Sequence, residues 1–82
     1  MSRDTPYQLA EYARIGYYGN PCPHLSSSPA WCAHMLGKYL HDTGRAIPHD
    51  VRMGRDKSIR ANDMRFTFQV SDDKSIRFER IE

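Results

Sequence analysis

An antiparallel hairpin is predicted by the stretch from Met64 to Ile81, MRFTFQVSDDKSIRFERI. Apolar and polar side chains alternate on both sides of a polar turn, which is the period of strands that bury one face. We therefore expect strands at 64–70 and 75–81. Their apolar side chains should share the face that packs on the rest of the chain, and these are Met64, Phe66, Phe68, Val70, Ile76 and Phe78.

A short motif at the turn of this hairpin also occurs earlier in the chain. Asp56-Lys57-Ser58-Ile59-Arg60 is repeated as Asp73-Lys74-Ser75-Ile76-Arg77. Taken as turns that lead into strands, the two copies predict a second hairpin with strands at 51–54 and 58–61. Asn62-Asp63 would connect the two hairpins. The C-terminal half is thus predicted to be a four-stranded antiparallel meander.

Upstream of the strands the apolar spacing is helical, and two helix start signals contain proline. Thr5-Pro6 predicts a helix at 6–16, and Ser28-Pro29 predicts a second helix at 29–43. The segment between them contains two further prolines and is predicted to be a loop. The expected fold class is α+β, a single domain in which an N-terminal helical hairpin packs on the meander.

Each predicted helix has an apolar face for the core. In the first helix this stripe contains Leu9, Tyr12, Ala13 and Gly16. In the second it contains Cys32, Leu36, Tyr39 and Leu40, with Met35 beside them. The opposite face of the second helix, which we expect to meet water, contains His34, Lys38, His41 and Asp42.

Charge is distributed unevenly along the 82 residues. The net charge is only +2, but residues 45–82 contain nine Lys and Arg against seven acids, whereas residues 1–44 contain three of each. The N-terminal residues lack the apolar run of a signal peptide, and the longest uncharged stretch is interrupted by polar residues and prolines. We therefore expect a cytoplasmic protein of a bacterium, or of something that infects one, with no membrane association.

Basic residues of the predicted meander are the strongest functional indication. On the outward face or the turns they form a candidate site for phosphate or an acidic partner, consisting of Arg52, Arg55, Lys57, Arg60, Arg65 and Arg77. The alternative is a solvated face on which acidic neighbours such as Glu79 neutralise them. No aromatic residues interleave with them, so stacking of unpaired bases is not indicated.

Aromatic residues near the loop suggest a second surface. Tyr17, Tyr18 and Trp31 are of the types that anchor protein interfaces. The alternative is that these rings cover the thin core from the loop side.

Two Cys-x-His pairs raise the question of zinc. Cys22 with His24, and Cys32 with His34, have the right ligand chemistry, but a single intervening residue is shorter than the usual spacing. On a helix it turns Cys32 and His34 about 200° apart. The favoured interpretation is a buried Cys32 and solvated histidines, without a metal or other cofactor. The two cysteines are expected to be reduced thiols, although a single disulfide is the alternative.

A further pattern runs through residues 16–37. It consists of Gly16-Tyr17, Gly19, Asn20-Pro21-Cys22-Pro23-His24, Trp31 and Gly37. The pattern resembles ribosome modulation factor and its phage and plasmid relatives, which are small basic proteins, but His24 stands where an aromatic is usual and the β half is foreign to them. The resemblance implies docking on a ribosome or another nucleoprotein, with Trp31, Cys22 and Pro23 as contact candidates.

No nucleophile elbow, phosphate loop or metalloprotease helix occurs, and a chain this short has little volume for a substrate pocket. We therefore predict a non-enzymatic regulator that docks on a nucleic acid or nucleoprotein through its basic residues. The alternative is a phage- or plasmid-type inhibitor that binds a protein and occludes a host enzyme or defence complex. An exposed edge strand at 76–81 would also allow a homodimer.

Overall fold

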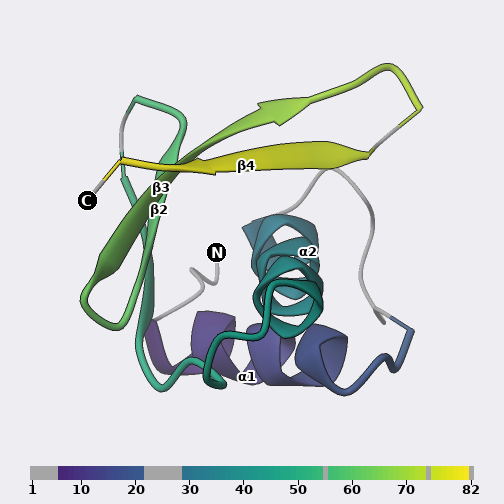
Figure 1. Ribbon diagram of the computed structural model, residues 1–82, viewed down its shortest axis with the longest axis vertical. Helices are drawn as coiled ribbons and strands as arrows, with labels where there is room; N and C mark the ends of the chain where they lie inside the picture. The colour runs from purple at the N-terminus through teal and green to yellow at the C-terminus, as the bar shows by residue number, and fades with distance from the viewer. Residues whose placement is uncertain (1–5, 22–28, 55, 74, 82) are drawn as a thin grey trace, which may run out of the picture.

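The computed structural model describes residues 6–21, 29–54, 56–73 and 75–81 (Figure 1). Two helices, α1 (Pro6–Tyr17) and α2 (Pro29–Asp42), are followed by four strands, β1 (Val51–Met53), β2 (Ser58–Ala61), β3 (Met64–Val70) and β4 (Ile76–Arg80). The predicted α+β architecture is confirmed. Element boundaries differ from the predicted ones by one residue at most, which is the usual uncertainty at helix and strand ends.

Both helices end in the same way. Gly19 and Gly44 have φ angles of +81° and +74°, a left-handed conformation that glycine adopts without steric cost. In α1 the N–H of Asn20 donates to the carbonyl oxygen of Ile15, and after α2 the N–H of Arg45 donates to that of Leu40. These bonds satisfy carbonyl groups that a helix end leaves without partners. Gly44 lies two residues after Asp42, the last residue of α2.

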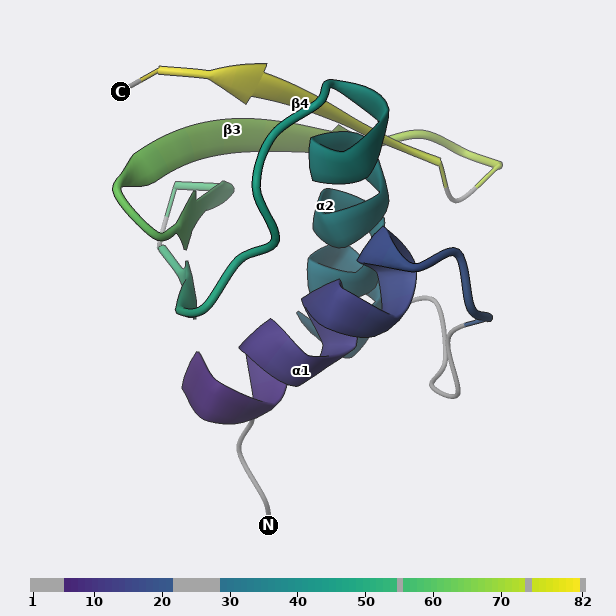
Figure 2. The same cartoon turned by 60° about the horizontal axis from the view of Figure 1, so that its bottom comes forward.

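The helices cross in close contact, and two glycines make the contact possible (Figure 2). A Cβ atom at Gly16 would overlap the carbonyl oxygen of His34, and one at Gly37 would overlap that of Ala13. Each helix therefore presents a glycine to the backbone of the other. Both glycines therefore have a packing role.

The sheet is a meander of order β1-β2-β3-β4 in which all neighbours are antiparallel. Asn62 forms the turn between β2 and β3 with a φ of 55°, and its side-chain oxygen accepts from the backbone N–H of His49 at 2.8 Å. That bond fastens the sheet to the segment that follows α2. β1 and β4 are the two edge strands.

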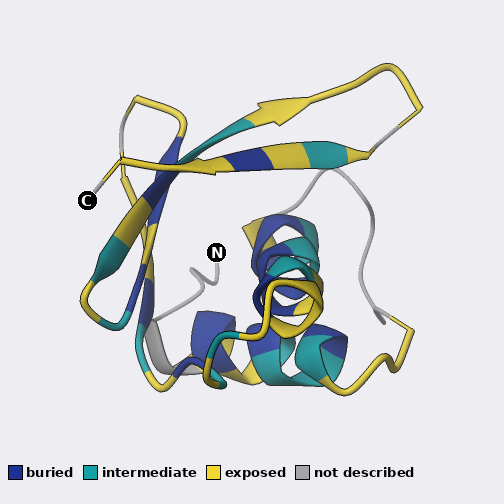
Figure 3. Ribbon diagram, in the orientation of Figure 1, coloured by how far each residue is buried: buried dark blue, intermediate teal, exposed yellow. Residues whose placement is uncertain are grey.

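The core lies between the inner face of the sheet and the helices (Figure 3). Leu36 and Leu40 of α2 are fully buried with Ile59 and Phe66 of the sheet. Tyr39 joins the layers, because its ring lies 5.7 Å from that of Phe66 and 5.4 Å from that of Phe78. Neither described helix is long and apolar enough to cross a membrane.

Two burial expectations are wrong. Val70 is 52% exposed, because the β3–β4 hairpin extends past α2 and its outer end covers no core (Figure 3). His34 is only 8% exposed. This side of α2 is covered by the C-terminal part of α1 and by Asn20, which lies in the loop after α1. The remaining predicted core residues of the two helices are buried or partly buried.

Candidate functional site

Three arginines form a row across the outward face of the sheet. In the ladders Arg52 lies opposite Arg60, and Arg60 lies opposite Arg65. Directly opposed residues of antiparallel strands point to the same face of a sheet. All three side chains are exposed. We call Arg52, Arg60 and Arg65 the arginine row.

The ladder geometry brings two members of this row especially close. Two backbone hydrogen bonds show which residues bond to which neighbouring strand. Phe68 N–H donates to the Lys57 carbonyl, and Gly54 N–H donates to the Ser58 carbonyl. Along β2 the odd-numbered residues therefore bond to β3 and the even-numbered residues bond to β1. It follows that the Arg60–Arg65 pair exchanges no backbone bonds. Such pairs have Cα atoms about 4.5 Å apart, against about 5.5 Å for a bonded pair. Their side chains are therefore in the closer of the two arrangements.

Like charges placed directly opposite each other destabilise a sheet. One acid offsets part of this cost, because Nε of Arg52 donates to both carboxylate oxygens of Asp50 at 3.2 Å. The described residues provide no such ion pair for Arg60, and this central arginine thus contributes positive potential to the outward face. Asp50 thus neutralises part of the charge of Arg52.

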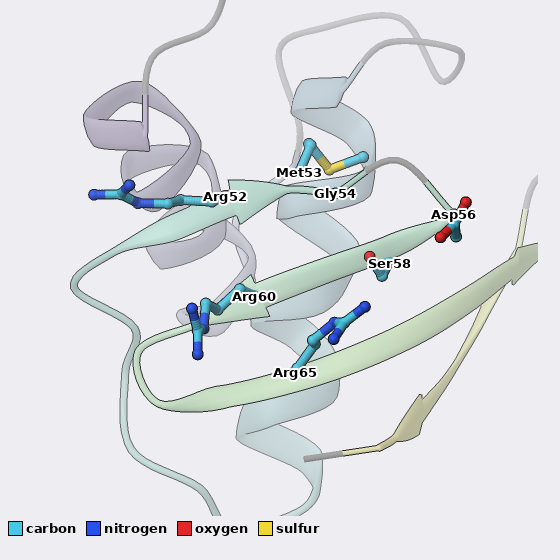
Figure 4. A pocket seen from close by; sticks show the side chains of 7 residues that line it. All are labelled: Arg52, Met53, Gly54, Asp56, Ser58, Arg60 and Arg65. Atoms are coloured by element: carbon cyan, nitrogen blue, oxygen red, sulfur yellow. The ribbon is translucent and has the colours of Figure 1, made fainter.

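A hollow of ≈ 440 Å³ lies at the row (Figure 4). Its lining consists of the three arginines together with Met53, Gly54, Asp56 and Ser58. Gly54 permits the close turn, because a Cβ there would overlap the hydroxyl oxygen of Ser58. In Figure 4 the guanidinium of Arg65 extends towards Ser58, whereas that of Arg52 points away from β2. The hollow thus joins guanidinium groups, a hydroxyl and one carboxylate.

The other basic candidates are not part of the row. Arg77 lies on β4 opposite Gln69, near Thr67 and Glu79, at a separate hollow of ≈ 200 Å³. Lys57 is exposed at the turn before β2, with a φ of 51°. Arg55 lies outside the described residues. Of the five predicted basic residues that the structure describes, it therefore brings three together.

The repeated motif occupies two turns, as predicted, but the copies differ in detail. Asp73 accepts hydrogen bonds from the backbone N–H and the hydroxyl of Ser75, at 3.1 and 2.7 Å. These bonds hold the pKa of the Asp73 carboxyl below its usual value. Ser58, the equivalent of Ser75, is instead buried beside Gly54. Sequence similarity between the copies gave no sign of this difference.

Comparisons with models of protein families, with curated proteins and with solved structures give no match.

The aromatic candidates separate into two groups. Tyr17 and Tyr18 meet edge to face at 5.8 Å, and Tyr17 also contacts His41 at 5.3 Å. The Tyr17 hydroxyl donates to the carbonyl oxygen of Arg45 at 2.6 Å. Tyr17 therefore has a packing role, as the alternative interpretation expected, whereas Tyr18 is 69% exposed. Trp31 lies ten residues before His41, about 15 Å away along α2.

Trp31 stacks on His34, with ring centroids 5.7 Å apart and an interplanar angle of 16°. His34 Nε2 lies 2.7 Å from the carbonyl oxygen of Asn20. A carbonyl oxygen only accepts, so Nε2 carries the proton and donates. Nδ1 is buried and has no hydrogen-bond partner among the described residues. The histidine thus ties α2 to the end of α1.

The structure describes two of the four zinc candidates, Cys32 and His34. Cys22 and His24 lie outside the described residues. Cys32 is a free, buried thiol whose pKa is raised to about 11 by burial, and this opposes formation of the thiolate that zinc requires. Within the described ranges no three His, Cys, Asp or Glu side chains are grouped as metal ligands.

Proposed function

We propose that the protein is a non-enzymatic regulator that docks on a nucleic acid or nucleoprotein, and that the arginine row contacts the phosphate backbone. The observation that carries this proposal is the Arg52–Arg60–Arg65 register. A row of directly opposed like charges costs folding stability, and a bound polyanion converts that cost into binding energy. Guanidinium groups suit this role because each forms paired hydrogen bonds to phosphate oxygens.

The form of the partner follows from what surrounds the row. Neighbouring strands lie about 4.8 Å apart, so the Cα atoms of the row span about 10 Å. The described outward positions beside it are polar, Thr67 and Gln69 among them, and offer no aromatic ring for stacking. Contact with backbone phosphates of a duplex, without base readout, fits this chemistry best. A cytoplasmic, ribosome-like particle is one such partner, in line with the resemblance to ribosome modulation factor.

The test is a titration of the protein into a fluorescently labelled RNA duplex, read by anisotropy. If three phosphates are neutralised, affinity should fall roughly 40-fold between 50 and 200 mM salt. A DNA duplex of equal length should show a similar dependence, because the contacts are to the backbone. Absent binding, or binding that does not change with salt, would contradict the proposal.

A second candidate function is a protein-binding inhibitor, and one observation favours it. Tyr18 is the most exposed of the large apolar side chains described, and it borders a hollow of ≈ 470 Å³ with Lys38 and His41. Exposed tyrosines beside a hollow are typical anchors for a protein partner. Capture from nuclease-treated lysate, lost in Tyr18→Ala and retained in Arg60→Gln, would favour this function over the first.

A further inference from the structure

At the outer edge of β4 some backbone groups point away from β3, and the ladder between the two strands shows which ones. Ile81 N–H donates to the carbonyl of Arg65, and Ser71 N–H donates to that of Ser75. Bonded pairs alternate along an antiparallel ladder. The odd-numbered residues of β4, Arg77 and Glu79, thus bond to β3. The even-numbered residues, Ile76, Phe78 and Arg80, direct their N–H and C=O groups outward.

No described strand or helix covers this edge, and its charges are self-complementary. β4 is the last strand of the sheet, and Figure 2 shows it along the margin of the molecule. Arg77 and Glu79 are exposed on the outward face, and neither makes an ion pair within the described residues. The strand reads Ile76-Arg77-Phe78-Glu79-Arg80, with opposite charges on either side of a central Phe78.

We propose that two copies of the chain pair through β4 as antiparallel strands centred on Phe78. In this register Phe78 lies opposite Phe78 of the second copy, and the two strands can exchange backbone hydrogen bonds there. Ile76 lies opposite Arg80 of the second copy. Arg77 then lies opposite Glu79 of the second copy, and Glu79 lies opposite its Arg77. These pairs do not exchange backbone bonds, which places their side chains in the closer arrangement.

The neighbouring registers are disfavoured by charge. In a two-fold arrangement the even-numbered residues of one strand must lie opposite even-numbered residues of the other. The register can therefore shift only by two residues at a time. One step in one direction places Arg77 opposite Arg77. One step in the other direction places Glu79 opposite Glu79. Like charges directly opposite are destabilising, so the Phe78-centred register is selected.

Such a dimer has one sheet that continues from β1 of one copy to β1 of the other. Directly opposed residues share a face, so the two-fold axis is perpendicular to the sheet and the outward faces of both copies lie on the same side. The dimer would therefore present two arginine rows to one partner. Pairing itself involves only β4 and does not depend on what the rows bind.

The test is sedimentation equilibrium of the whole chain, whose mass is 9.5 kDa. The wild type should approach twice that mass as concentration rises. Arg77→Glu and Glu79→Arg should each raise the dissociation constant about tenfold or more, because each replaces two attractive pairs by two repulsive ones. Lys38→Glu reverses an exposed charge on α2 and should leave dimerisation unchanged.

Mixing the two charge-reversal variants provides the decisive arm. A chain with Glu at both positions and a chain with Arg at both positions restore two attractive pairs, so the mixture should form a heterodimer of near wild-type affinity. The double variant Arg77→Glu/Glu79→Arg should again form a homodimer. A wild type that is monomeric at every concentration, or a dimer indifferent to these charges, would overturn the proposal. Circular dichroism melting checks that each variant is folded.

Discussion

Arg60 lies opposite Arg65 in the ladder between β2 and β3, at a position where the two backbones exchange no hydrogen bonds. The two guanidinium-bearing chains thus start from the closest spacing that an antiparallel sheet offers. Arg52 continues the row on the other side of Arg60. A small domain has a thin stability margin, and opposed like charges reduce it further. We therefore infer that the arginine row serves binding.

Removing the central charge should stabilise the free protein. Arg60→Gln eliminates both like-charge oppositions, and we expect the free energy of unfolding to rise by about 0.5–1 kcal/mol at low salt. The gain should shrink in 1 M salt, where exposed charges are screened. Arg77→Gln is the matched control, because Arg77 lies opposite Gln69 and its removal should give no gain. Urea unfolding curves measure both variants, and a loss of stability in Arg60→Gln would argue against the strained row.

The helix crossing should tolerate no side chain at Gly16. In Gly16→Ala the Cβ meets the carbonyl oxygen of His34, which as backbone cannot move aside. We expect a loss of about 2–3 kcal/mol despite the better helix propensity of alanine. Gly19→Ala provides the comparison, because open space surrounds that Cβ and only the positive φ opposes it, at a cost of about 1–2 kcal/mol. Equal or smaller destabilisation by Gly16→Ala would contradict the close crossing.

Alkaline solution should weaken the fold through Cys32. Burial raises the pKa of this thiol to about 11 in the folded state, from the value of 9.0 that applies to the unfolded chain. The unfolded chain therefore loses its proton first as the pH rises. Stability should be unaffected by Cys32 below about pH 8 and should fall by roughly 2 kcal/mol as the pH approaches 11.

Cys32→Ala checks this dependence. The variant loses packing at all pH values, but its stability should decline less steeply between pH 8.5 and 11 than that of the wild type. The same burial should slow alkylation of Cys32 by iodoacetamide at pH 7.5 in the native state. Rapid alkylation of Cys32, read by mass spectrometry of the peptide that contains it, would show that the thiol is accessible.

The elements could be predicted from the sequence because their signals are local. Each of these signals depends on a few neighbouring residues. Examples are the alternation of apolar and polar residues at 64–70, the turn at Asn62-Asp63, and the proline and glycine at the ends of α2. The burial of His34 could not be predicted in this way. It depends on the approach of α1 and on the Asn20 carbonyl, which are tertiary contacts made possible by Gly16.

The candidate site was predicted in composition but not in arrangement. The sequence placed Arg52, Arg60 and Arg65 on one face, but their opposition depends on register, which is set by the two turns together. It also grouped Arg77 with them, although the order of the strands puts Arg77 at the far edge. The contact between Gly54 and Ser58 has no local sequence signal beyond the glycine itself.

The salt dependence of duplex binding, compared between the wild type, Arg60→Gln and Lys38→Gln, tests the central role of the arginine row most directly. Both variants lose one positive charge, but only Arg60 belongs to the row. We expect Arg60→Gln to weaken binding and to reduce the slope of log affinity against log salt by about 1, with Lys38→Gln close to wild type. Equal effects of the two variants, or none from Arg60→Gln, would contradict the assignment.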